Sequence, residues 1–226
     1  MKMILKTFPA RVILVLALLS GLLLSGSPAG ADEKPSLLIL PFLADKGENT
    51  EKGAVCPVCQ TYHRHGEIQP GAHKTVTRAL YAKVDLLESF RIVPQDQAEE
   101  LLVREGIDRF EEDPRSVAVS LGKEIGVQFV MTGYLFRFQD RVGAALSAER
   151  PASVGLDLHL FRVRDGRMIW GGRFNETQQP LSDNLFKLGS FLRRKASWVT
   201  GEELAAVGMG EMLKKLPSAK ALEEMK

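Results

Sequence analysis

Apolar residues along this chain occur in short runs that switch between strand-like and helix-like spacing. Residues 36–43 (SLLILPFL) form a continuous apolar run, which is typical of a buried strand. Pro41 has no backbone N–H, so we expect this strand to end near an edge or a turn. Residues 73–87 place apolar side chains on one helical face, and residues 90–93 return to a short strand.

Two further helices are predicted from their start and stop signals. Residues 94–105 carry apolar side chains at helical intervals, and Gly106 is a typical stop. Asp113 followed by Pro114 predicts the start of another helix, with aspartate as N-cap and proline in the first turn.

The second half of the chain predicts an antiparallel region. The Asp165–Gly166 dipeptide favours a tight hairpin turn. Three strands are expected here, at 126–138, 153–163 and 168–174, and the dipeptide lies between the last two. Two helices are expected to follow, at 185–198 and 202–216. The adjacent glycines Gly171 and Gly172 predict a β-bulge in the last strand.

This order of elements predicts an α/β (α+β) fold. We expect a mixed sheet of about five strands with an antiparallel meander, helices packed on it, and C-terminal helices. The organisation expected is a signal peptide at 1–31 and a single α/β domain at 32–226, with a long Cys/His-containing loop at 44–72. A loop of that length in a compact domain is usually functional or unstructured.

Residues 1–31 have the three parts of a secretory signal peptide. Basic residues precede an apolar core at 12–24 that is too short to span a bilayer, and small residues at 29–31 form a cleavage pattern. Ser27 occupies the position at which a bacterial lipobox would carry its lipidated cysteine, so we expect a processed periplasmic protein without a lipid anchor. An uncleaved segment acting as an anchor is disfavoured by the same short core.

Charge restricts the class of partner. The chain has 30 basic and 28 acidic residues, and three of the basic ones lie in residues 1–31, so the remainder carries a net charge of −1. Beyond the short basic run 193–195 there is no basic block, which disfavours nucleic-acid binding. No later apolar run approaches 18 residues, so no transmembrane span is expected in the mature chain.

One cluster carries possible chemistry. Cys56 and Cys59 are separated by two residues, a spacing that places two thiolates on one side of a tight turn, and His63 and His65 follow closely. These four side chains form a candidate Cys₂His₂ site for Zn²⁺, and metal binding would supply free energy to order the polar loop. Most zinc modules separate their ligand pairs by about a dozen residues or more, which weakens the match.

Other interpretations of the same cluster stay open. The cysteine pair can be inert, oxidised or redox-active, although a thioredoxin-like motif normally follows a strand and opens a helix. A c-type haem site is excluded because Gln60, and not histidine, follows Cys59. His159 alternates with leucines in the strand at 153–163, so we expect a solvated or helix-covered sheet residue there.

Three segments resemble a group of bacterial envelope proteins. They are the opening strand LLILPF at 37–42, the helix and strand SLGKEIGVQFVMTGYLFRF at 120–138, and the hairpin at 154–174. The group includes the amino-terminal domain of the Tol-system β-propeller protein, the curli-secretion lipoprotein and the lipoprotein activators of penicillin-binding proteins. The resemblance implies non-enzymatic work: docking partners in the cell envelope, assembling secretion or wall-synthesis machinery, or forming homo-oligomers, with a possible association with the outer membrane. The missing lipobox cysteine and the loop at 48–72 depart from the pattern.

Two functional hypotheses follow. The first is a non-enzymatic periplasmic or envelope-associated accessory protein that acts through protein–protein contacts. The alternative is a metal-binding or thiol-redox protein centred on the CPVC sequence at 56–59. An enzyme is disfavoured because the sequence contains no nucleophile elbow, Walker loop or dinucleotide fingerprint.

Overall fold

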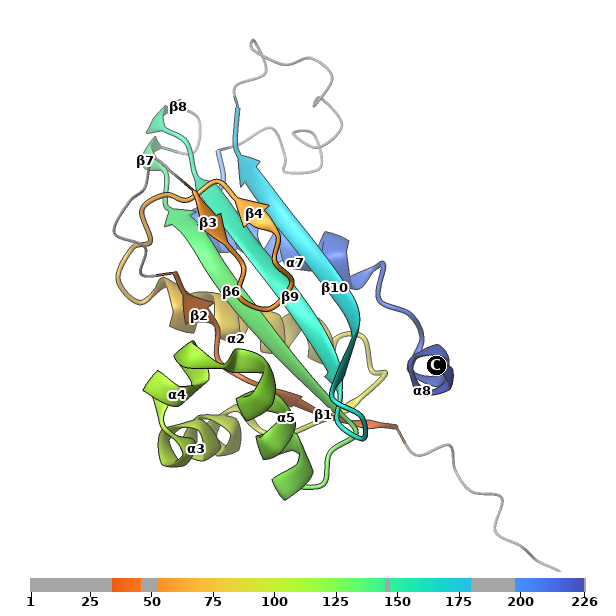
Figure 1. Cartoon of the computed structure of the whole chain (residues 1–226). Helices are drawn as coiled ribbons and strands as arrows, with labels where there is room; N and C mark the ends of the chain where they lie inside the picture. Colours follow the sequence, from red (N-terminus) through yellow and green to blue (C-terminus); the bar gives the residue numbers. More distant parts are fainter. Residues whose placement is uncertain (1–33, 46–52, 145–146, 180–197, 226) are drawn as a thin grey trace, which may run out of the picture. The chain divides into compact units, whose positions relative to one another are not determined.

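A mixed sheet forms the centre of the protein (Figure 1). The computed structural model describes residues 34–45, 53–144, 147–179 and 198–225. The strands run in the order β10-β9-β6-β1-β5, with β2 also pairing β6; their bounds are β1 (Ser36–Ile39), β2 (Leu43–Ala44), β5 (Arg91–Ile92), β6 (Phe129–Gln139), β9 (Ser153–Arg162) and β10 (Arg167–Thr177). Strand β1 lies parallel to β5 and β6, whereas β6, β9 and β10 form an antiparallel meander. The predicted fold class is confirmed.

The opening apolar run divides at Pro41, as its missing N–H predicts. Strand β1 ends at Ile39, and β2 resumes pairing with β6 at Leu43, opposite Tyr134. All residues of β1 are buried because helices cover both faces of the sheet at this strand.

Helices α2 (Ala72–Asp85) and α7 (Gly201–Leu213) pack on one face of the sheet (Figure 1). Helix α8 (Ala219–Glu224) adds Leu222 to the same core. The apolar face of α2 belongs to the same core cluster as Leu158 and Leu160 of β9. The Thr200 side chain and Glu203 form a reciprocal capping box at the start of α7.

The opposite face is shared between helices and a hairpin. Helices α3 (Gln95–Glu105), α4 (Ile107–Glu112) and α5 (Pro114–Glu124) form a second core with β1, β6 and β9. The β3–β4 hairpin, made of β3 (Ala54–Val55) and β4 (Tyr62–His63), covers a further part of this face. In Figure 1 this hairpin, in orange, passes over β6 and β9.

Some of the local predictions are confirmed by the structure, and some elements of the structure were not predicted. Asp113 caps α5 by accepting a hydrogen bond from the Ser116 N–H, as predicted. Helices α4 and α8 were not expected, nor were β3 and β4 within the predicted loop at 44–72, nor the short strands β7 (Val142–Ala144) and β8 (Ser147–Arg150). The signal peptide at 1–31 lies outside the described residues, as does nearly all of the helix predicted at 185–198. Among the helices that the structure describes, none combines the length and apolarity needed to cross a membrane.

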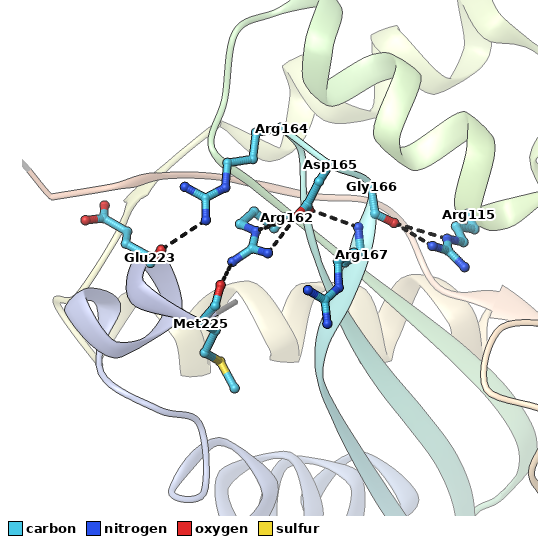
Figure 2. A network of polar contacts seen from close by, with 8 residues as sticks. All are labelled: Arg115, Arg162, Arg164, Asp165, Gly166, Arg167, Glu223 and Met225. Atoms are coloured by element: carbon cyan, nitrogen blue, oxygen red, sulfur yellow. Dashed lines mark hydrogen bonds and ion pairs between the residues drawn. The ribbon is translucent and has the colours of Figure 1, made fainter.

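An arginine network holds the C-terminal helix against the β9–β10 turn (Figure 2). The Arg162 guanidinium binds the Asp165 carboxylate and also donates to the Met225 carbonyl. Arg164 donates to the Glu223 carbonyl at 3.3 Å, and Arg115 donates twice to the Gly166 carbonyl. The turn therefore connects α5 on one side with the end of α8 on the other.

Asp165 is expected to titrate at unusually low pH. Hydrogen bonds from Arg162 lower the pKa of this carboxyl to about 2, from an ordinary value of 3.8. Because the folded pKa lies below the unfolded one, the ion pair stabilises the fold above about pH 4. That stabilisation disappears as the pH falls through about 2. A carboxyl carbon-13 titration by NMR should place the midpoint near the lower value, and Arg162→Gln should move it upward; an unchanged midpoint in the variant would contradict the assignment.

Candidate metal centre

A tight turn in the β3–β4 hairpin places Cys56 and Cys59 on the sheet. Pro57 follows Cys56, and its fixed φ suits the first central position of a turn. The Cys56 N–H donates to the Thr61 carbonyl at 2.9 Å, and the Gln60 N–H donates to the Cys56 carbonyl at 3.0 Å. Gln60 itself has a φ of 58°, which closes the turn. Cys56 is buried and Cys59 is partly exposed.

Strand β9 presents two polar side chains to this turn. Leu156, Leu158 and Leu160 belong to the core under α2 and α7. Side chains alternate along a strand, so Asp157 and His159 point to the opposite face, where the hairpin lies. Both are 1% exposed, because the hairpin covers them.

Four potential ligands from the hairpin and β9 converge. The Cys56 Sγ lies 3.6 Å from the His159 Nε2, and the Cys59 Sγ lies 3.4 Å from the Asp157 Oδ2. The His159 Nε2 and the Asp157 Oδ2 are 4.0 Å apart, and all four ligand atoms lie within 4.8 Å of one another. In a tetrahedral zinc site, bond lengths of about 2.0–2.3 Å place ligand atoms roughly 3.3–3.8 Å apart. The cluster could therefore hold a metal ion after small adjustments.

The two histidines predicted as ligands lie next to carboxylates. The His63 Nε2 lies 2.7 Å from the Asp157 Oδ2, and its ring stacks on Phe136 with centroids 3.8 Å apart. The His65 Nε2 lies 3.2 Å from the Asp45 Oδ2. The structure thus brings Cys56 and Cys59 together with Asp157 and His159, and His63 joins this group through Asp157. Ligation by His63 and His65 stays a prediction.

Burial favours the neutral forms of two of the four groups. Desolvation raises the pKa of the Cys56 thiol to about 12, although backbone hydrogen bonds from Cys59 and Val58 act in the opposite direction. Desolvation lowers the pKa of His159 to about 4; His63 also lowers it, while Asp157 opposes the shift. A neutral imidazole is the form that binds metals. A cation would offset the desolvation of a Cys56 thiolate, so metal binding would exchange for the thiol proton.

Backbone hydrogen bonds continue the attachment of the hairpin beyond β4. The Gly66 N–H donates to the Phe136 carbonyl at 3.1 Å, and the Phe138 N–H donates to the Glu67 carbonyl at 2.9 Å. A side chain at Gly66 would collide with Arg137, because its Cβ would lie 2.5 Å from the Arg137 Cδ. The segment after the hairpin is therefore fixed along β6, and this constrains where the cysteine turn lies.

Sequence reasoning identified the cysteines but missed their β9 partners. His159 was expected to be solvated or helix-covered, and the hairpin covers it instead. Asp157 gave no signal beyond being polar in an alternating strand. Partners 98 and 103 residues away from the cysteines become recognisable only when the sheet brings them under the turn.

Comparisons with solved structures find similar arrangements at low sequence identity. The PelC dodecamer from Paraburkholderia phytofirmans is 11% identical, with 79% of this chain and 84% of that chain covered and a TM-score of 0.44. The LpoB C-terminal domain from Salmonella enterica is 17% identical, with coverages of 66% and 87% and a TM-score of 0.38. Lipoprotein GNA1162 from Neisseria meningitidis is 14% identical, with coverages of 72% and 95% and a TM-score of 0.40.

These neighbours include a lipoprotein, GNA1162, and the LpoB C-terminal domain; the resemblance of the sequence motifs to lipoprotein activators of penicillin-binding proteins stays a prediction. TM-scores below 0.5 do not establish a shared function. No family model and no curated protein sequence matches the chain.

Proposed function

We propose that this chain is a zinc-binding protein in which the metal fastens the β3–β4 hairpin to the sheet. One observation carries the proposal: Cys56 and Cys59 from the hairpin meet Asp157 and His159 from β9 with all ligand atoms within 4.8 Å. Two thiolates, one imidazole and one carboxylate suit a tetrahedral Zn²⁺ ion. His63 would act on the metal indirectly by hydrogen-bonding the Asp157 carboxylate, a frequent arrangement around protein metal ligands.

A bound metal would stabilise the β3–β4 hairpin, which has little stability of its own. Strands β3 and β4 contain two residues each, and an isolated hairpin is marginally stable at best in water. A metal bound to both the turn and β9 converts part of its binding free energy into folding free energy. A thiol-redox role for Cys56 and Cys59 is the competing use of the same turn.

Metal content and thiol accessibility test the proposal directly. The full chain, purified without chelator, should retain about one zinc ion per chain, a stoichiometry that elemental analysis measures. Its thiols should react with a thiol reagent only after a chelator is added. Absence of bound metal together with a Cys56–Cys59 disulfide would reject zinc binding and favour the redox alternative.

A second candidate function is accessory work in the cell envelope through protein–protein contacts, in a periplasmic or outer-membrane-associated location. The outer surface of the hairpin favours it. Val55 and Tyr62 are directly opposite each other on β3 and β4, and they are 55% and 61% exposed. Aromatic residues are enriched at protein interfaces. The metal would then fix a contact surface in place.

Site-specific crosslinking tests this second role. A photoreactive amino acid at Tyr62 should crosslink to another protein or to a second copy of the chain in intact cells. The same residue at Leu86, which is 75% exposed at the end of α2, is the control and should crosslink far less. If Tyr62 and Leu86 give equal yields, or neither gives a product, the hairpin is not a contact surface.

A further inference from the structure

A solvent-accessible groove lies beside the proposed zinc site. It has a volume of about 390 Å³, which is within the range of small-molecule sites. The hairpin forms one wall and β10 the other, and the main lining residues are Cys59, Thr61, Asp157, His159, Gly171 and Arg173. Three of the four proposed metal ligands therefore border the same opening.

Gly171 keeps the groove open above His159. In the antiparallel pair, Gly171 of β10 is directly opposite His159 of β9, so the two residues share a face of the sheet. A Cβ at Gly171 would meet only the Leu158 carbonyl oxygen, at 3.6 Å. The pairing is regular at Gly171 and Gly172, so the bulge predicted there is wrong; the register shift lies between Met168 and Trp170. The glycine leaves space where any larger residue would stand over the imidazole.

The guanidinium of Arg173 adds a positive charge to the lining of the same groove. It is directly opposite Asp157, and its Nε lies 3.7 Å from the Asp157 Oδ1, beyond hydrogen-bond distance. The Arg173 side chain is 47% exposed. The Asp157 Oδ1 is buried and has no hydrogen-bond partner among the described residues. The guanidinium therefore has N–H groups available to a second oxyanion.

We infer that this groove binds a small oxyanion, a carboxylate or a phosphate, that takes the place of the Asp157 carboxylate on the metal. The inference rests on the proposed zinc site. One ligand oxygen would bind the metal, and a second would accept from the Arg173 guanidinium, whose planar fork suits such anions. The displaced Asp157 keeps its hydrogen bond from His63 and its proximity to Arg173.

Charge balance supports exchange at Asp157 over addition of a further ligand. Two thiolates and one carboxylate already exceed the charge of Zn²⁺ by one. Adding another anion would increase that excess, whereas replacing Asp157 by a carboxylate or by a monoanionic phosphate leaves the summed charge of the metal ligands unchanged. Asp157 is also the ligand whose oxygen already has a hydrogen-bond partner that competes with the metal, because its Oδ2 lies 2.7 Å from the His63 Nε2.

Cobalt spectroscopy of the full chain tests the inference. Co²⁺ in the site gives visible absorption bands that respond to a change of ligand, and inorganic phosphate and acetate are the two probes. We expect saturable band shifts with at least one probe; which of them responds identifies the oxyanion. Arg173→Ala should weaken binding about tenfold or more, the loss of one charge-assisted hydrogen bond. Gly171→Val should abolish the response while Co²⁺ remains bound.

Arg167→Ala is the matched control, since Arg167 is an exposed arginine at the first position of β10. It should leave the titration unchanged. Bands that do not respond to either probe, or a response equal in Arg173→Ala and wild type, would overturn the oxyanion site and leave the zinc site standing. Failure of the wild-type chain to retain Co²⁺ would instead reject the zinc site itself.

Discussion

Replacing both Cys56 and Cys59 by serine should abolish metal retention and lower the melting temperature while the central sheet stays folded. The two cysteines supply half of the proposed ligands, and both lie in the hairpin turn, outside the sheet. Serine has nearly the same size but does not provide a thiolate. The variant therefore removes the metal without creating a cavity in either apolar core.

The size of the effect follows from linkage between binding and folding. A metal present at about a thousandfold above its dissociation constant stabilises the folded state by about 4 kcal/mol. For a chain of this length, each kcal/mol changes the melting temperature by about 2–4 °C, so we expect a decrease of roughly 8–16 °C. Thermal unfolding and elemental analysis of the purified full chain measure the two effects.

Two controls separate the effect of losing the metal from the effect of altering the turn. Gln60→Ala alters an exposed residue of the same turn and should retain the metal. Wild-type protein treated with a chelator should melt at the temperature of the double variant. A double variant with unchanged metal content and melting temperature would show that the cysteines hold no metal.

Phe129→Ala should destabilise the sheet itself by about 3–5 kcal/mol, the usual cost of truncating a buried phenylalanine. Phe129 is 1% exposed and packs edge-to-face on Phe90, with ring centroids 6.2 Å apart. It lies on β6 opposite Leu37 of β1, so the cavity would open between the parallel and antiparallel parts of the sheet. The melting temperature should fall by roughly 6–20 °C.

Urea denaturation measures this change as a lower midpoint at an unchanged slope. The loss should be the same with and without chelator, which separates it from the effect of the cysteine variant. Val103→Ala, at a site that is 70% exposed on α3, should change stability by less than about 0.5 kcal/mol. A Phe129→Ala variant as stable as Val103→Ala would contradict the position assigned to this ring.

Local chemistry determined much of the framework. The missing N–H of Pro41 divides the first strand, Asp113 caps α5, and Asp165–Gly166 forms the β9–β10 turn. Each of these effects acts within a few residues, so it can be predicted from neighbouring positions. Helix α4 was missed because its six residues give too short a pattern to establish a period.

The candidate metal centre was likewise predictable from the sequence only in part. The spacing of Cys56 and Cys59 is local, and the sequence by itself predicts that both thiols lie in one turn. Asp157 and His159 are defined as partners only by tertiary structure, because β9 alternates its side chains and the sequence does not specify what covers its polar face. The expected neighbours His63 and His65 are close in sequence, but strand geometry and packing direct them to Asp157 and Asp45.

The sequence by itself determined the fold class, the positions of most strands and helices, and the pair of thiols. The folded structure decided which groups surround those thiols, that β9 is buried on both faces, and that Gly171 and Arg173 border an opening onto them. The physical reason is the distance along the sequence between the interacting residues. Turns, caps and periodicity depend on adjacent residues, whereas the ligand cluster depends on packing between the hairpin turn and β9, about a hundred residues apart.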